Sequence, residues 1–107
     1  MEAPRRVTDW FVYIISNNAH TLYVGATNNL PRRIFEHKNR TYTTSFTARY
    51  TFDRCVYFEC VGQKAAAIAR EQQIKRWSRK KKVFLIQRIN PEWSDLSARF
   101  SLERILS

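Results

Sequence analysis

The sequence predicts an α/β domain of the α+β type, in which a small three-stranded antiparallel sheet is flanked by helices. Two short runs rich in β-branched and aromatic residues, 11–15 and 22–25, flank a polar stretch and indicate a β-hairpin. A third alternating run, 54–61, indicates another strand. Three segments without internal glycine, 30–38, 63–77 and 79–89, favour helices.

The hairpin should bring two tyrosines to one face of the sheet. If Tyr13 pairs with Tyr23, then Ile15 faces Thr21 and a short loop around Asn18 closes the turn. Opposite residues of an antiparallel pair point to the same face, so both phenols should share it. Strand tyrosines are commonly packing residues, and a phenol pKa near 10 makes a poor base. The residues alone therefore favour packing.

The first helix should begin just after the hairpin. Gly25 ends the second strand, Asn28-Asn29 offers an N-cap, and Pro31 falls in the first turn, where a missing N–H is tolerated. This helix should span residues 30–38.

Two functional groups share a face of this helix. Arg33 and His37 are four residues apart, and Arg32 and Glu36 form a separate i,i+4 pair. A guanidinium can clamp a phosphate and an imidazole can deprotonate water. The alternative is an ordinary solvated helix face.

The connection over residues 39–52 is rich in threonine and shows no convincing period. Its arginines and aromatics could contact a nucleic-acid backbone and stack on exposed bases, or the aromatics could tuck under the sheet. The two interpretations weigh about equally for Arg40, Tyr42, Phe46, Arg49 and Tyr50.

The third strand contains both cysteines of the chain. Val56, Phe58 and Cys60 should alternate with Cys55, Tyr57 and Glu59. Odd spacing places Cys55 and Cys60 on opposite faces, so we expect no disulfide, which fits a reducing compartment. The spacing of cysteines and histidines also argues against a zinc site.

The helix over residues 63–77 carries a carboxylate within its apolar stripe. Glu71 follows Ala67 and Ile68 by four and three residues and precedes Ile74 by three. A carboxylate there needs a cation, because burying it unpaired is costly. That cation could be Mg²⁺ or a nearby arginine, and spacing alone favours the arginine.

The last predicted helix, 79–89, follows a Ser78 cap and ends at Asn90-Pro91, with Val83, Ile86 and Ile89 on its buried face. The tail 94–107 contains five large apolar residues and is a plausible packed helix capped by Asp95. These apolar residues are Leu96, Phe100, Leu102, Ile105 and Leu106.

The chain of 107 residues has a formal charge of +10, from 19 Lys and Arg against 9 Asp and Glu. Such a charge on one small domain suggests a polyanionic partner, and aromatics interleaved with the charge favour nucleic acid over a membrane surface. A basic cluster at a helix junction should contact the nucleic-acid backbone without sequence specificity, although a solvated junction is the plain alternative. It consists of Lys75, Arg76, Arg79, Lys80, Lys81 and Lys82. No signal segment or membrane-spanning run is visible, so we expect a cytoplasmic protein.

The order of these residues resembles the GIY-YIG nuclease family. Phe11-Val12-Tyr13 stands where the family has its first tripeptide, and Tyr23-Val24-Gly25 where it has its second. Arg33 and His37 follow on the helix and Glu71 on the next one, in the family's order. The resemblance covers most of the chain and is closest to the small single-domain bacterial subgroup.

The resemblance implies a metal-dependent endonuclease that hydrolyses DNA phosphodiester bonds and selects structure rather than sequence. It places Tyr13, Tyr23, Arg33, His37 and Glu71 in the active site, with Glu71 as the ligand of Mg²⁺ or Mn²⁺ and with no small-molecule cofactor. Residues 1–107 would form one domain with a core of about 9–93. Some relatives carry a supporting asparagine after the glutamate, for which Asn90 is the nearest candidate.

Two other functions remain open. One is a catalytically weak nucleic-acid binding module of the same fold, and the other is a protein-interaction domain whose partner subunit chooses the substrate. The first would bind DNA without cutting it. The second would act only with its partner, and the sequence does not identify such a protein.

Overall fold

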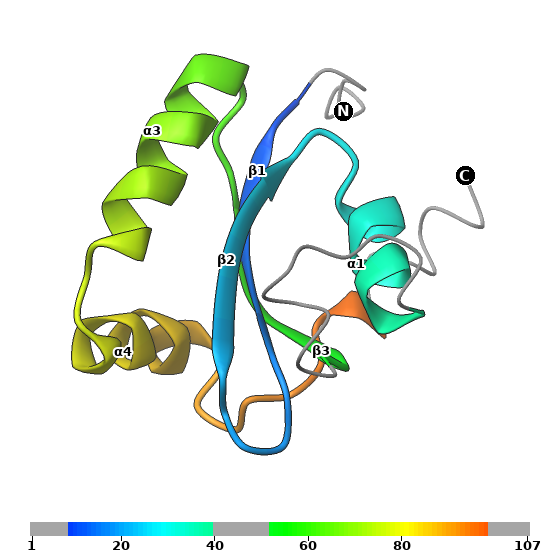
Figure 1. Ribbon diagram of the computed structural model, residues 1–107, viewed down its shortest axis with the longest axis vertical. Helices are drawn as coiled ribbons and strands as arrows, with labels where there is room; N and C mark the ends of the chain where they lie inside the picture. The colour runs from blue at the N-terminus through cyan, green and yellow to red at the C-terminus, as the bar shows by residue number, and fades with distance from the viewer. Residues whose placement is uncertain (1–8, 40–51, 99–107) are drawn as a thin grey trace, which may run out of the picture.

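The computed structural model describes residues 9–39 and 52–98, and it confirms the predicted fold class (Figure 1). Strands β1 (Phe11–Ser16), β2 (Leu22–Thr27) and β3 (Arg54–Cys60) form an antiparallel sheet in the order β2-β1-β3. Helix α1 (Leu30–Lys38) lies between β2 and β3 in sequence, and α3 (Lys64–Lys75) and α4 (Arg79–Ile89) follow β3. The expectations for residues 40–51 and 99–107 lie outside the described residues.

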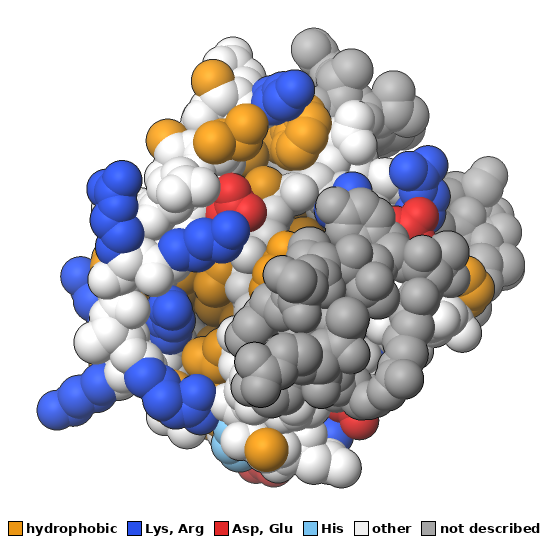
Figure 2. All heavy atoms as spheres, in the orientation of Figure 1, with side chains coloured by type: hydrophobic (Ala, Val, Ile, Leu, Met, Phe, Trp, Pro, Cys, Tyr) orange, Lys and Arg blue, Asp and Glu red, His pale blue; other side chains and the backbone are white. Residues whose placement is uncertain are grey.

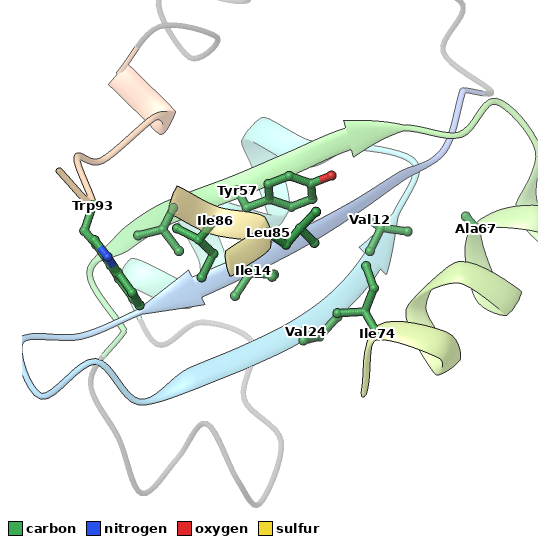
Figure 3. Close-up of a cluster of buried hydrophobic side chains, with 10 residues drawn as sticks. Val12, Ile14, Val24, Tyr57, Ala67, Ile74, Leu85, Ile86 and Trp93 are labelled. Atoms are coloured by element: carbon green, nitrogen blue, oxygen red, sulfur yellow. The ribbon is translucent and has the colours of Figure 1, made fainter. Parts of the chain in front are cut away.

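The sheet separates two apolar cores. On one face, β1 residues Val12 and Ile14 pack with residues of α3 and α4, among them Ile74 and Ile86 (Figure 3). On the other face, Phe11, Tyr13 and Ile15 of β1 pack with α1 residues and with Phe52 and Cys55. Every residue of β1 is buried, as expected for a central strand covered on both faces. Figure 1 shows α1 on one side of the sheet and α3 and α4 on the other.

The predicted hairpin is present, but its predicted register is wrong by two residues. Tyr13 pairs with Gly25, and Ile15 pairs with Tyr23. The connecting loop is longer than expected, because the Asn17 side-chain oxygen accepts hydrogen bonds from the backbone N–H groups of Ala19 and Thr21. The two tyrosines still share one face, because a shift of two residues preserves the alternation.

The observed register gives the Tyr13 ring its space. A Cβ atom built on Gly25 would lie 2.4 Å from the Tyr13 hydroxyl oxygen and 2.5 Å from its Cζ. Any other residue at position 25 would therefore collide with the phenol. Gly25 is needed here for close approach of a side chain, and the Tyr13 ring lies across β2 as a result.

Strand β3 contains a bulge that the sequence pattern does not reveal. Its pairing with β1 shifts between Ile14 and Ile15, so Val56 is the extra residue and packs on the same face as Tyr57. The expected alternation of Val56 with Tyr57 is therefore wrong. The bulge also changes the sheet face on which Cys55 lies relative to Cys60.

Cys55 and Cys60 pair with β1 residues Ile15 and Phe11, which lie on one face of the sheet. The prediction that the cysteines point to opposite faces is therefore wrong. The absence of a disulfide is confirmed, since both thiols are free. Their β1 partners are four residues apart, roughly 13 Å along a strand, which is too far for a disulfide.

The helices begin at the predicted caps. The Asn29 side chain accepts from the backbone N–H of Arg32 at the start of α1, and Ser78 does the same for Lys81 at the start of α4. Their buried faces differ in detail from the prediction. Ile68 of α3 and Ile89 of α4 are exposed, whereas Leu85 is buried, so the buried face of α4 is rotated toward Leu85.

The segment after α4 returns to the edge strand β3. The Leu96 N–H donates to the Cys55 carbonyl at 2.8 Å, and the Cys55 N–H donates to the Asp95 carboxylate at 3.0 Å. Asp95 also accepts from Lys38 at the end of α1 and from both the N–H and hydroxyl of Ser97. This carboxylate therefore joins α1, β3 and the C-terminal segment, and these bonds hold its pKa below its usual value despite partial burial.

Over the described residues, no helix combines the length and the apolar composition that crossing a membrane requires.

The close approach at Gly25 gives a stability prediction with a sign. Gly25→Ala should lower the free energy of unfolding by about 1–3 kcal/mol, because the added methyl displaces the Tyr13 ring from a packed core. In a Tyr13→Ala background the same change should be neutral or stabilising, because alanine is ordinarily preferred to glycine inside a strand. Urea unfolding of the four proteins measures this double-mutant cycle. Equal penalties in both backgrounds would contradict the register.

Candidate active site

Tyr13 and His37 meet on the α1 face of the sheet. The Tyr13 hydroxyl oxygen lies 3.1 Å from His37 Nε2, and both side chains are buried. The Asn29 cap starts α1 so that its second turn carries His37 over β1. The two rings come from positions 24 residues apart, and their centroids are 6.0 Å apart.

Burial keeps both groups of this pair uncharged at neutral pH. The pKa of Tyr13 is raised, chiefly by burial and then by Tyr23, with Glu71 acting in the same direction and Arg33 opposing it. The pKa of His37 is lowered to about 4, chiefly by burial and then by the Arg33 charge, against a smaller effect of Glu36. At neutral pH the phenol therefore carries its proton and the imidazole is uncharged.

Tyr23 and Arg33 lie beside this pair and nearer the surface. The Tyr23 ring is half-buried, with its centroid 5.4 Å from that of His37. The Arg33 side chain is 25% exposed, and its Nε lies 3.4 Å from a Glu36 oxygen. The expected Arg32–Glu36 pair is confirmed at 3.3 Å, but Glu36 also contacts Arg33, which the helical spacing rule did not single out.

Glu71 reaches this region from the opposite face of the sheet. It stands on α3 between Ala67 and Ile74, both fully buried against the other core. Helix α3 therefore covers the sheet face opposite the two tyrosines. The Glu71 charge makes a small contribution to the raised Tyr13 pKa. Helix α3 packs against β2, the strand across which the Tyr13 ring lies.

The Glu71 carboxylate already has a cation in this structure. Lys75 Nζ lies 3.3 Å from it, one turn along α3, so the expected need for a positive partner is met within the helix. The Glu71 side chain is 16% exposed and that of Lys75 is 42% exposed. The lysine end of this pair is exposed to solvent, so the lysine can leave the carboxylate to another cation.

This donor set fits a Mg²⁺ or Mn²⁺ ion that is shared with a substrate. Within residues 9–39 and 52–98, no three or more His, Cys, Asp or Glu side chains cluster as a metal cage would require. Mg²⁺ commonly binds through one or two carboxylates and completes its shell with water and phosphate oxygens. One partly exposed carboxylate suits that mode of binding.

Sequence reasoning missed the contact that fixes the rotation of α3. Arg70 binds both oxygens of Glu59 on β3, with Nε at 2.8 Å and Nη2 at 3.2 Å, and Tyr57 also donates to Glu59. Arg70 directly precedes Glu71 on the helix, so the Arg70–Glu59 ion pair also sets the direction in which Glu71 points. An acidic residue in a strand was the only available signal, and its partner is 11 residues away in sequence.

The basic cluster lies at the junction of α3 and α4, beside Glu71. Its side chains are exposed except that of Lys82, which is partly buried. Trp77 supports the junction, with Lys81 Nζ 4.5 Å and the Arg70 guanidinium 5.3 Å from its ring centroid. Figure 2 shows Lys and Arg side chains gathered over α3 and α4 on the left of the view.

Asn90 has a structural part in this fold. Its amide nitrogen donates to the carbonyls of Val56 and Ser94, and its oxygen accepts from the Ser94 N–H. It therefore binds the β3 bulge and the turn after α4. These contacts explain why a polar side chain is buried at this position.

Comparison with known proteins identifies the relatives of this chain. The GIY-YIG catalytic domain matches residues 9–83. A UPF0213 protein of Haloquadratum walsbyi is 34% identical over 87 residues, which cover 81% of this chain and 92% of that protein. A UPF0213 protein of Syntrophus aciditrophicus is 37% identical over 82 residues, covering 77% and 93% of the two chains.

A solved structure is also similar. The solution NMR structure of a UPF0213 protein from Bacillus halodurans matches with a TM-score of 0.52 and 25% identity. The match covers 81% of this chain and 92% of that one. That protein therefore has a fold similar to the fold of this chain.

The buried pair predicts an unusual titration of His37. Its imidazole resonances should titrate near pH 4 in NMR spectra, and His37→Gln assigns them because the chain has only one other histidine, His20. The unfolded chain takes up this proton near pH 6.5, so the contribution to stability is full above that value and is lost as pH falls toward 4. His37→Gln should therefore weaken the acid sensitivity of unfolding. A titration midpoint near 6.5 would show that the imidazole is solvated.

Proposed function

The chain belongs to the GIY-YIG nuclease family and, within it, to the small UPF0213 proteins, and from that premise we propose that it is a metal-dependent DNA endonuclease. The observation that carries the proposal is the 3.1 Å contact between the buried Tyr13 hydroxyl and His37 Nε2, with Tyr23 beside it. Tyr13, Tyr23, Arg33 and His37 come from the α1 face, and Glu71 comes from α3.

The Tyr13–His37 pair is suited to activate water. Tyr13 cannot act as a base alone, because burial raises its pKa and keeps its proton in place. It can take a proton from water while passing its own to His37 Nε2, 3.1 Å away, since the imidazole is neutral. The water oxygen then attacks phosphorus in line with the leaving 3′ oxygen. The imidazole finally holds the proton.

Arg33 and Tyr23 are placed to hold the phosphate. The Arg33 guanidinium donates to non-bridging oxygens and stabilises the charge that develops on them. The half-buried Tyr23 hydroxyl orients the same group from the β2 side. A Mg²⁺ or Mn²⁺ ion on the Glu71 carboxylate would supply a Lewis acid for the phosphate and the leaving oxygen. Glu71 would release Lys75 when such an ion binds.

The basic cluster supplies affinity along the substrate backbone. Lys75, next to the Glu71 carboxylate, begins it, and the cluster continues into the first turn of α4. Phosphate contacts of this kind position nucleic acid without reading its bases. We therefore propose that the protein selects its DNA substrate by structure rather than by sequence.

A binding module of the same fold is the second candidate. The Glu71–Lys75 ion pair favours it, because the carboxylate then has a cation without a metal ion. Such a protein would bind DNA through the basic cluster and leave the phosphodiester intact.

Glu71→Gln separates these two functions. Cleavage of DNA in Mg²⁺ should be abolished, because the variant loses the carboxylate that would hold the metal ion. Affinity for DNA should stay the same or rise, since a negative charge leaves a basic surface. Gel assays of cleavage and of binding on single-stranded, duplex, nicked and branched DNA measure both quantities.

Glu92→Gln is the matched control, since Glu92 is an exposed carboxylate outside the cluster and should be silent. Circular dichroism verifies the folding of both variants. Wild-type cleavage by a folded Glu71→Gln protein would make Glu71 structural.

A further inference from the structure

Helix α4 exposes an aromatic ring within a field of cations. Its 11 residues, RKKKVFLIQRI, include five Lys or Arg and no acidic residue. Phe84 is 65% exposed, although Leu85 and Ile86 beside it are buried in the core. Helical spacing places four exposed polar residues around the ring, and together they form the α4 outer face. These four are Lys80, Lys81, Gln87 and Arg88.

The cations of α4 stand at the less favourable end of the helix. Lys80, Lys81 and Lys82 all lie in its first turns, and no acidic residue occupies the first turn. The helix dipole is positive there, so each of these cations is placed unfavourably. Ser78 caps the helix but brings no charge to offset this repulsion. A bound phosphate would relieve it.

The Phe84 ring has a cost of its own. An aromatic side chain that stays mostly in water gives up most of the free energy that burial would provide. Phe84 therefore adds little to the stability of the fold, and a lysine would suit the position better. Two unfavourable choices on one surface are expected where that surface serves a function.

We propose that the α4 outer face is a nucleotide-binding surface of the substrate path, on which Phe84 stacks against an unpaired base while Lys80, Lys81 and Arg88 contact its phosphates. Every base presents a π-face, so stacking tolerates any sequence. The neighbouring cations provide the charge complementarity for a polyanion. The proposal rests on the proposed nuclease function and adds to it a contact with a base outside the candidate active site.

The position of α4 relative to the cluster supports this path. Only residues 76–78 separate α4 from the end of α3, where Lys75 pairs with Glu71. Lys81 lies over Trp77 of this junction, so the two helices are held together at that point. A backbone that follows the cations from α4 therefore arrives beside Glu71.

Charge excludes a second copy of this chain as the occupant. The protein carries +10, and two α4 outer faces would bring their cations together with no acidic residue of α4 to oppose them. An anionic lipid surface shares the charge requirement, so vesicles of phosphatidylserine form a separate arm of the test.

The test measures binding in the Glu71→Gln background, so that it does not require cleavage. Fluorescence anisotropy with a labelled 20-nucleotide single strand and with a 20-base-pair duplex gives the two affinities. Phe84→Ala should weaken single-strand binding by about 5-fold to 100-fold, the range for loss of one stacked base. Duplex binding should change less than 2-fold, and the salt dependence should stay the same, since no charge is removed.

Three further variants serve as controls. Phe84→Trp should keep single-strand affinity, and its fluorescence should be quenched when the base stacks. Ile89→Ala, an exposed apolar change on the same helix, should be silent. Replacing Lys80 and Lys81 with glutamine should weaken binding to both the single strand and the duplex. It should also reduce the slope of log affinity against log salt, by up to about 0.7 per phosphate contact on single strands.

The outcomes separate this proposal from the nuclease function. Loss of single-strand affinity in Phe84→Ala supports the stacking surface even if the wild type never cuts DNA. Unchanged affinity in a folded Phe84→Ala protein overturns it even if the wild type cuts efficiently. Loss of vesicle binding alone, with DNA binding intact, would assign the surface to lipid and also overturn the proposal.

Discussion

The close approach of the Tyr13 ring to Gly25 is the constraint on which the site depends. Because position 25 has no side chain, the phenol lies across β2 and its hydroxyl reaches beyond the β1 backbone. This position puts it within 3.1 Å of His37 on α1 and close to the charge of Glu71 on α3. One missing Cβ thus gives a β1 phenol the space to lie across β2 and contact an imidazole of α1.

Burial determines what these groups can do. It keeps Tyr13 protonated and His37 neutral, so the pair can move a proton without holding a charge at rest. Arg33 and Glu71 remain partly exposed, and each has an exchangeable ion pair on its own helix. The interior of the cluster therefore suits proton transfer, while its rim suits phosphate and metal. This division matches the chemistry of phosphodiester hydrolysis.

Local sequence signals were enough to predict the elements and their caps. Asn29 and Ser78 act within one helical turn, so their effect is visible in sequence. The register was missed because Asn17 builds a loop from its own side-chain bonds, and the Val56 bulge left no trace in the apolar pattern. Helical spacing was enough to place Arg33 and His37 on the same face of α1. The face of the sheet that α3 covers could not be predicted, because tertiary packing decides it.

Single-turnover cleavage of DNA by the wild type and by Tyr13→Phe in Mg²⁺ is the most direct test of whether the Tyr13–His37 pair activates water. The variant removes one oxygen and keeps the ring, so packing over Gly25 should survive. We expect the wild type to cut DNA and the variant to be slower by about 10²-fold to 10⁴-fold, with its affinity for DNA unchanged. Equal rates would remove Tyr13 from the chemistry. A wild type that binds every DNA structure and cuts none would contradict the nuclease.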